Sequence, residues 1–211
     1  VKYRRIVRNA FTPSKVDSYA PRFREVVREA VDAIAARGEC EFVTDIARVL
    51  PLIAICEILG VPIEDRTKFF DWTNTMLGAD DPDLNLSEFD GQMAAAELYM
   101  YADNIMARHP DNPQDDIVGA LLRGSIGGER LNEDEFRSFM LLLIVAGNET
   151  TRTMTSQGMR LLLEHPEQYR MMFDDPSLVP DAVEDILLFN PAVINFRRTV
   201  TEPTEVGGQA L

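Results

Sequence analysis

The chain has 211 residues, of which 45% are hydrophobic and 27% are charged. This composition excludes a disordered chain and predicts a globular protein that forms one domain or part of one. The formal net charge of -14, with no cluster of basic residues to offset it, argues against a nucleic-acid partner.

The sequence also limits membrane, disulfide and metal-binding functions. Residues 139–146 form an apolar run well short of the roughly 18 residues that span a bilayer, and the first residues lack a signal-peptide pattern. Cys40 and Cys56 are too few and too widely separated for a disulfide framework, so we expect ordinary small buried or half-buried residues and a cytoplasmic location. His109 and His165 lack a cysteine at metal-ligand spacing, which argues against a protein metal cage.

Hydrophobic periodicity predicts a mainly α-helical chain. The helices are expected, in chain order, at residues 15–36, 43–59, 64–77, 87–106, 117–123 and over about thirty residues after Asn132. Turn-rich connectors are expected at residues 78–83, 111–116 and 124–128. Only the last fifteen residues look extended, and they predict a hairpin at Gly207-Gly208.

The long helix after Asn132 is the most informative segment. Asn132 can cap it, Glu135 completes a capping box, and Pro166 is a natural stop. Its length would be roughly 45 Å at 1.5 Å per residue, enough to cross a whole domain as the spine of the fold. The run from Phe139 to Val145 is apolar on every side, which predicts a helix buried all round.

Residues 146–152, Ala-Gly-Asn-Glu-Thr-Thr-Arg, interrupt this apolar helix. Gly147 costs about 1 kcal/mol relative to Ala within a helix, and a buried carboxylate at Glu149 is expensive unless it is paired. A functional role for Glu149 would explain that cost. Alternatively, Glu149 pairs with Arg152 one turn away where the helix emerges into solvent, and Gly147 permits a close helix crossing. These residues alone leave both interpretations open.

Residues 146–151 resemble the central-helix signature of the cytochrome P-450 superfamily, whose usual form is Ala/Gly-Gly-x-Asp/Glu-Thr-Thr/Ser. Flanking segments resemble soluble bacterial members in the same order: residues 3–13, 42–62, 163–168, 182–187, 196–199 and 207–208. The resemblance covers essentially the whole chain. It implies a cytochrome P-450 fold fragment, with a helical bundle around the long central helix and a short β segment at the C-terminal end. Residues 1–211 would be a single partial domain from the middle of a larger one.

The resemblance also assigns roles to residues of the central helix. Glu149 and Thr150 would be the acid and alcohol pair that organises water and passes protons to iron-bound dioxygen. Ala146 and Gly147 would leave room over the haem face. These four residues are the expected catalytic and haem-facing positions of the helix.

Other expected site residues lie near the two ends of the chain. By resemblance, Arg4 and Arg198 would pair with the two haem propionates. The stretch that precedes Arg198 would line the substrate pocket: Val193, Ile194, Asn195 and Phe196. The cysteine that ligates the iron in the family is expected beyond Leu211.

The sequence departs from the family at one position. The Glu-x-x-Arg pair of the family falls on Asp185-Ile186-Leu187-Leu188, and Leu188 cannot form the buried ion pair that an arginine would make. Losing one partner of such a pair typically costs about 3 to 5 kcal/mol, so we expect weaker haem retention. A sequence error, a degenerate gene and a genuine variant remain open.

The resemblance implies a haem-dependent monooxygenase that hydroxylates an apolar small molecule, such as a sterol, a terpenoid or a branched lipid. Dioxygen would be the oxidant, and a ferredoxin with its ferredoxin reductase would supply electrons. The alternative is a non-catalytic or degenerate relative that binds a lipid or a partner protein. A purely structural helical protein would require that Glu149 and Thr150 be replaceable without any effect beyond stability.

Overall fold

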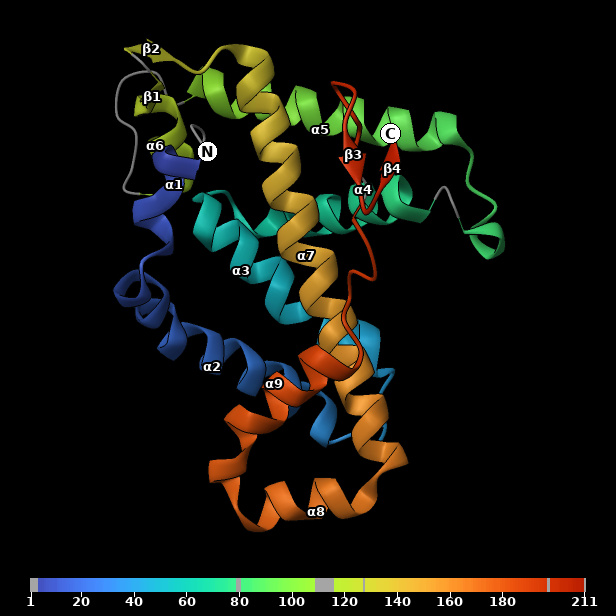
Figure 1. The fold of residues 1–211 in the computed structure, drawn as a ribbon. Coiled ribbons are helices and arrows are strands. Elements are labelled where there is room, and N and C mark those ends of the chain that lie inside the picture. The colour runs from blue at the N-terminus through green and yellow to red at the C-terminus, as the bar shows by residue number, and fades with distance from the viewer. Residues whose placement is uncertain (1–3, 79–80, 109–115, 127, 197, 211) are drawn as a thin grey trace.

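The computed structural model describes residues 4–78, 81–108, 116–126, 128–196 and 198–210. Helices dominate this part of the chain (Figure 1), which confirms the predicted mainly α-helical class. The α-helices are α1 (Arg4–Val7), α2 (Pro13–Ala35), α3 (Val49–Leu59), α4 (Arg66–Gly78), α5 (Glu88–Arg108), α6 (Ile117–Arg123), α7 (Glu133–Glu164), α8 (Pro166–Asp174) and α9 (Val179–Phe189). Short 3-10 turns lie at η1 (Arg8–Phe11), η3 (Ile63–Asp65), η4 (Pro82–Leu84) and η5 (Pro176–Leu178).

Helix α7 is the spine of the fold, as predicted. It runs for 32 residues and ends immediately before His165. Its capping box is formed: Glu135 N donates to Asn132 Oδ1 at 2.9 Å, and Asn132 N donates to Glu135 Oε2 at 2.9 Å. Figure 1 shows α7 crossing the molecule from α5 to α8, so residues 146–152 lie near its middle.

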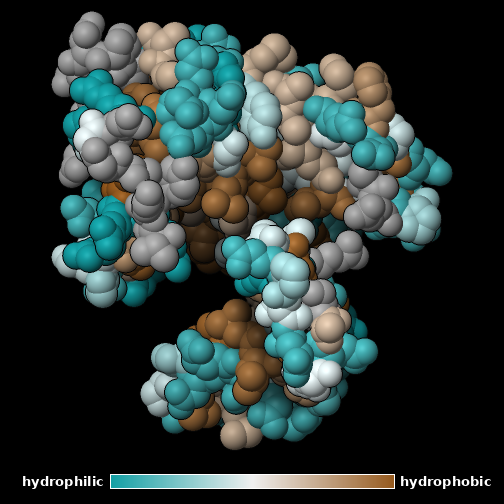
Figure 2. Space-filling view, turned by 45° about the horizontal axis from the view of Figure 1, so that its top comes forward, coloured by the Kyte–Doolittle hydropathy of each residue, from teal (hydrophilic) through white to brown (hydrophobic). Residues whose placement is uncertain are grey.

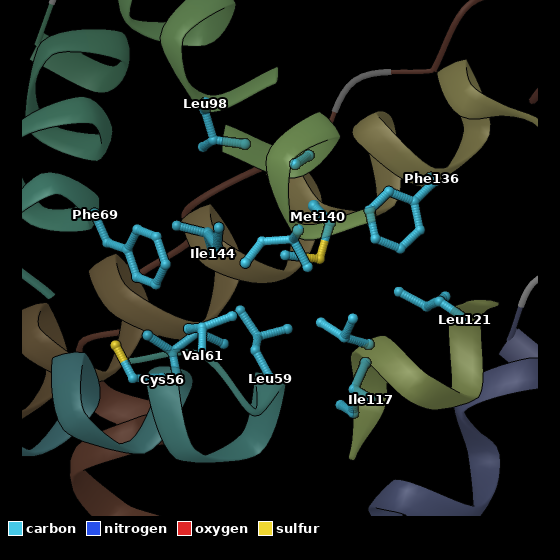
Figure 3. Packing of buried hydrophobic residues seen from close by; sticks show 14 of the residues in the cluster. Cys56, Leu59, Val61, Phe69, Leu98, Ile117, Leu121, Phe136, Met140 and Ile144 are labelled. Atoms are coloured by element: carbon cyan, nitrogen blue, oxygen red, sulfur yellow. The ribbon is translucent and has the colours of Figure 1, made fainter. Parts of the chain in front are cut away.

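The hydrophobic core surrounds the first half of α7. Phe136, Met140 and Ile144, four residues apart, form its buried stripe and meet side chains from α3, α4, α5 and α6 (Figure 3). Spacing of three or four residues places side chains on one face of a helix. The prediction that the Phe139–Val145 run is buried all round is wrong, because Leu142 is 57% exposed. Neighbouring helices cover one side of this segment and leave the other side open.

The second half of α7 packs against α8 and α9. Gly158 allows α9 to approach closely, since a Cβ added there would lie 3.2 Å from Ile186 Cδ1. In Figure 1 this part projects below the rest of the molecule, and Figure 2 shows apolar side chains around the hollow between the two parts. The apolar faces of α8 and α9 are therefore only partly covered.

Two predicted segments differ from the structure. Residues 43–59 do not form one helix: a π-helical turn, η2 (Val43–Ala47), precedes α3, and Arg48 Nε donates to the Thr44 carbonyl at 2.8 Å where they meet. Within the expected turn-rich connector at residues 124–128, Ser125 and Ile126 form strand β1 (Ser125–Ile126), which pairs antiparallel with β2 (Glu129–Arg130). Extended structure is therefore not confined to the last fifteen residues.

The remaining predictions are mostly confirmed. The C-terminal hairpin pairs β3 (Glu205–Val206) with β4 (Gln209–Ala210), and Gly207 and Gly208 both adopt the positive φ that a tight hairpin turn requires. Gly60, with φ of 77°, ends α3 as expected. Connector residues 79–80 and 111–115, and His109, lie outside the described residues.

The two cysteines differ in burial. Cys56 is buried in the core, whereas Cys40 is exposed, so the expectation that both are at least half-buried is wrong for Cys40. Within the described ranges, no helix combines the length and the apolar character needed to cross a bilayer.

Candidate functional site

The central segment of α7 has two sides with different surroundings. One side, at Gly147, Asn148 and Arg152, faces α3 and α4. The other side carries Thr150 and Thr151, which line an open groove. This division arises because the buried stripe of α7 continues in steps of four from Ile144 to Asn148, so Thr150, two positions further on, lies on the opposite face of the helix.

Gly147 lies where α7 crosses α3. A Cβ added to Gly147 would lie 2.8 Å from Ile55 Cδ1, which is too close without movement of the isoleucine. The structure therefore supports a helix-crossing role for this glycine. Its expected contact with a haem stays a prediction.

Asn148 and Thr73 form a buried hydrogen bond between α7 and α4. Asn148 Nδ2 donates to Thr73 Oγ1 at 2.7 Å, and both residues are fully buried. The threonine hydroxyl donates in turn to the Phe69 carbonyl at 2.8 Å, which fixes its lone pairs toward Asn148. This bond holds the two helices in one register at the centre of the segment.

Glu149 is paired, as the structural interpretation of the sequence predicted. Arg152 Nη2 lies 2.6 Å from Glu149 Oε1 and 2.5 Å from Oε2. Thr153 Oγ1 also donates to Oε1, at 3.3 Å. The glutamate side chain is 27% exposed and is paired with Arg152, but its Oε2 is buried and accepts no hydrogen bond from the described residues, so the pairing offsets the cost expected for an unpaired buried carboxylate only in part.

Arg152 is held by three groups at once. Besides Glu149, its Nη1 donates to Asn74 Oδ1 of α4 at 2.8 Å, and its guanidinium lies 5.3 Å from the centre of the Phe70 ring. Only 15% of the arginine side chain is exposed. The acid of the segment is therefore tied to α4 through this guanidinium.

Thr150 lies on the opposite, open side. Its hydroxyl donates to the Ala146 carbonyl at 2.8 Å, within the helix. This bond uses the hydroxyl proton and leaves the oxygen lone pairs free to accept a hydrogen bond. Thr150 lines a largely apolar groove of about 520 Å³ between α7 and α9, together with residues such as Met154, Leu162 and Val183.

The other expected site residues are dispersed in this structure. Arg4 is exposed on α1, and Arg198, also exposed, has its guanidinium 5.7 Å from the centre of the Phe196 ring. Figure 1 shows α1 and the segment before β3 on opposite sides of α7, so the structure does not bring the two arginines together. Ala146 is exposed on α7.

The expected substrate-pocket stretch is likewise exposed. Its four residues lie on the surface and line neither the 520 Å³ groove nor a second groove of about 670 Å³ between α7, α8 and α9: Val193, Ile194, Asn195 and Phe196. Their role in a substrate pocket stays a prediction.

The expected effect of the departure at Asp185 and Leu188 on haem retention stays a prediction. Both residues lie on the surface of α9, and Leu188 is 83% exposed. The cost of about 3 to 5 kcal/mol applies to a buried partner left without its counter-charge. Because Asp185 is exposed to water, Leu188 leaves no buried carboxylate unpaired within the described part of the chain.

Neither cysteine can act as a thiolate beside Thr150. Cys56 belongs to the core, and its burial, with a smaller contribution from Asp65, raises the pKa of the thiol to about 12. Cys40 is exposed between α2 and η2. The described residues thus provide one largely apolar face with the Thr150 hydroxyl on it, but no iron ligand, and the Glu149 carboxylate lies toward Arg152 on the packed side.

Sequence reasoning did not identify Thr73, Asn74 or Asn148 as parts of this site. The place of Asn148 was readable, since it continues the stripe of Phe136, Met140 and Ile144. Thr73 and Asn74 carried no such signal, because nothing in the sequence shows which helix lies against α7. Their contribution follows from the packing of α4 on α7.

Comparisons with known proteins show similarity over almost the whole chain. No family model matches the chain. It is 41% identical over 208 residues to a steroid C26-monooxygenase of Rhodococcus jostii, covering 98% of this chain and 43% of that protein. It is 37% identical over 212 residues to a methyl-branched lipid omega-hydroxylase of Mycobacterium tuberculosis, covering 98% and 49%.

A solved structure shows the same fold. The structure is of a Mycobacterium marinum cytochrome P-450 in complex with pseudoionone, which superposes with a TM-score of 0.92 at 29% identity. That superposition covers 100% of this chain and 52% of the other. The chain thus spans about half the length of the proteins it matches.

Proposed function

Because this chain belongs to the cytochrome P-450 superfamily, we propose that the protein carrying it is a haem-dependent monooxygenase that hydroxylates an apolar small molecule. The substrate class is a sterol, a terpenoid or a branched lipid. Two relatives support this class by their names, which refer to a steroid and to methyl-branched lipids. The observation that carries the proposal is the placement of Thr150 on the open side of α7, next to a carboxylate that is fixed from behind.

The described residues fit one face of a haem. Thr150 and the exposed Ala146 offer a small, mostly apolar surface on α7. The pairing of Arg4 and Arg198 with the two carboxylates of the group rests on the resemblance alone, because these exposed arginines lie on opposite sides of α7. When bound, haem supplies the chemistry that activates dioxygen. The thiolate ligand has to come from a residue other than Cys40 and Cys56, given their positions.

Thr150 and Glu149 are proposed to manage protons. Hydroxylation consumes one dioxygen, two electrons and two protons, and yields the alcohol and one water. Thr150 Oγ1 donates to the Ala146 carbonyl, so its lone pairs can hold a water on the open side of the helix. The Glu149 carboxylate, at the neighbouring position, can take up and release protons for that water.

The electron source is also part of the proposal. A ferredoxin and its ferredoxin reductase would deliver the two electrons, as the resemblance to soluble bacterial members implies. The test is reconstitution of product formation with such a pair, compared with either protein omitted. The cytoplasmic location and the single partial domain stay predictions.

The decisive test of the cofactor is the carbon monoxide difference spectrum of the reduced full-length protein. A strongly red-shifted Soret band would show haem held by a thiolate. Absence of haem, or an unshifted band, would reject the monooxygenase and favour the alternative of a non-catalytic relative that binds a lipid or a partner protein. Recloning across Leu188 removes a sequencing error as an explanation.

The decisive test of the relay is Thr150→Ala. Loss of the hydroxyl should increase the fraction of consumed electrons that ends in hydrogen peroxide and decrease the fraction that ends in product, since the hydroxyl would no longer hold the water that delivers the protons. Thr155→Ala is the matched control, because Thr155 lines the same groove and its hydroxyl makes the same bond within α7, to the Thr151 carbonyl at 2.8 Å. Unchanged partition between product and peroxide in Thr150→Ala would reject the assigned role.

A further inference from the structure

Two consecutive residues of α4 fasten the segment of α7 that contains Glu149. Thr73 accepts from Asn148, the residue before Glu149, and Asn74 accepts from Arg152, one turn further on. The first bond is fully buried and joins α7 directly to α4. The second reaches a charged group that contacts the acid itself.

The orientation of Glu149 depends on Arg152 because the guanidinium contacts both carboxylate oxygens. An arginine side chain has many rotamers, and holding it in one costs conformational entropy. An ion pair between two side chains that have no other partners on a helix surface therefore does little to hold either side chain in one conformation. Here the guanidinium also has the Asn74 amide and the Phe70 ring as partners, and both belong to α4.

We propose that Asn74 and Arg152 are positioning residues for Glu149, the residue that precedes Thr150, and that α4 holds the carboxylate through them in one orientation. This inference rests on the proposed function, because a fixed carboxylate matters only if Glu149 exchanges protons. Asn74 is a neutral acceptor for Arg152, so it orders the guanidinium without competing as a second carboxylate would for its charge. Glu149 consequently remains the acidic partner of Arg152 in this pair.

Two substitutions of Asn74 separate ordering of the arginine from positioning of the acid. Asn74→Ala removes the acceptor and should release both Arg152 and Glu149. Asn74→Asp offers a carboxylate that competes for the guanidinium, so Arg152 stays ordered while Glu149 loses its charged partner and keeps only the Thr153 hydroxyl. Thr75→Val is the control on the same helix, since the Thr75 hydroxyl donates to Asp71 O within α4 at 2.8 Å.

The first measurement does not depend on turnover. In full-length protein with ¹⁵N-labelled arginine, the Nη protons of Arg152, assigned with Arg152→Lys, report how firmly the guanidinium is held. Asn74→Ala should speed their exchange with solvent by roughly ten- to hundredfold, the effect of losing one hydrogen bond to a charged group. Asn74→Asp and Thr75→Val should leave the exchange slow.

The second measurement is the fraction of consumed electrons recovered as hydrogen peroxide, with the solvent isotope effect on turnover. Both Asn74→Ala and Asn74→Asp should raise the peroxide fraction and the isotope effect, and Thr75→Val should change neither. If Asn74→Ala does not accumulate as folded protein, Asn74→Ser, which keeps a short polar group but shortens the reach, takes its place with the same expectation.

The outcomes separate the two proposals. If Thr150→Ala raises the peroxide fraction while both Asn74 variants leave it at the wild-type level, the relay stands and the positioning role of Asn74 is overturned, whatever the exchange rates. Unchanged Nη exchange in Asn74→Ala overturns it as well. If Thr150→Ala and Glu149→Gln both leave the peroxide fraction unchanged, the proposed relay itself fails and the positioning role fails with it.

Discussion

Replacement of Thr73 by valine tests the buried hydrogen bond between α4 and α7. Valine has nearly the shape of threonine, so the change removes the acceptor of Asn148 Nδ2 without opening a cavity. A buried amide left without a partner costs about 1 to 3 kcal/mol. Since Asn148 and Thr73 are both fully buried, water cannot reach the amide in place of the lost partner. We expect a loss of about 2 kcal/mol in the free energy of unfolding.

A double substitution makes this expectation sharper. Asn148 Oδ1 is buried and accepts no hydrogen bond in the described structure, so the asparagine already carries part of such a cost. Replacing both polar partners by apolar residues of similar shape is often nearly neutral. Thr73→Val with Asn148→Leu should therefore recover most of the stability that Thr73→Val loses, to within about 1 kcal/mol of the wild type.

The assay is urea unfolding of the full-length protein, followed by circular dichroism and by amide hydrogen exchange in α4 and α7. Thr75→Val again serves as control and should change the free energy of unfolding by less than about 0.5 kcal/mol. The reasoning would be refuted if Thr73→Val were as mild as that control. It would be refuted equally if the losses in the double variant simply added, because that result would show no coupling between the two side chains.

Four further outcomes are expected from other parts of the structure. A thiol reagent at pH 8 should label Cys40 and spare Cys56, whose pKa is raised by burial from the ordinary 9.0 to about 12. Because the pKa of this thiol is higher in the folded protein than in the unfolded chain, its contribution to the free energy of unfolding is complete below pH 9 and is lost as the pH rises toward 12. Cys56→Ala should therefore reduce the fall in the free energy of unfolding at alkaline pH, measured by urea unfolding. An identical fall in the variant and in the wild type would contradict the assignment. Asn132→Ala should cost about 1 kcal/mol and speed amide exchange in the first turn of α7, while Asn132→Ser should retain most of the cap. Leu188→Gln should change the unfolding free energy by less than about 0.5 kcal/mol, and a loss several times larger would show that this side chain is buried in the full-length protein.

The two sides of α7 explain why one short segment can satisfy both interpretations of its sequence. Gly147, Asn148 and Arg152 serve packing against α3 and α4, as the structural interpretation requires. Thr150 lies on the opposite side, where no helix of the described chain covers it fully. Glu149 is tied to the packed side through Arg152, while the next residue, Thr150, faces the open groove.

The sequence by itself determined the long central helix and its ends. Asn132, Glu135 and Pro166 act through bonds and steric limits within a few residues, so their effect does not depend on the rest of the fold. The C-terminal hairpin was equally readable, because Gly207 and Gly208 tolerate the positive φ of its turn. The same local signals failed at residues 124–128, where two-residue strands are too short to show alternation.

Only the tertiary structure decided which side of α7 is buried and what meets it there. The run from Phe139 to Val145 is apolar on every side, so its composition could not show that Leu142 is exposed. Glu149 and Arg152 were a possible pair from their spacing, but Asn74 and Thr73 became their neighbours only when α4 packed across α7. Spacing along one helix is fixed by its local geometry, whereas contacts between residues about 75 positions apart depend on how whole helices pack.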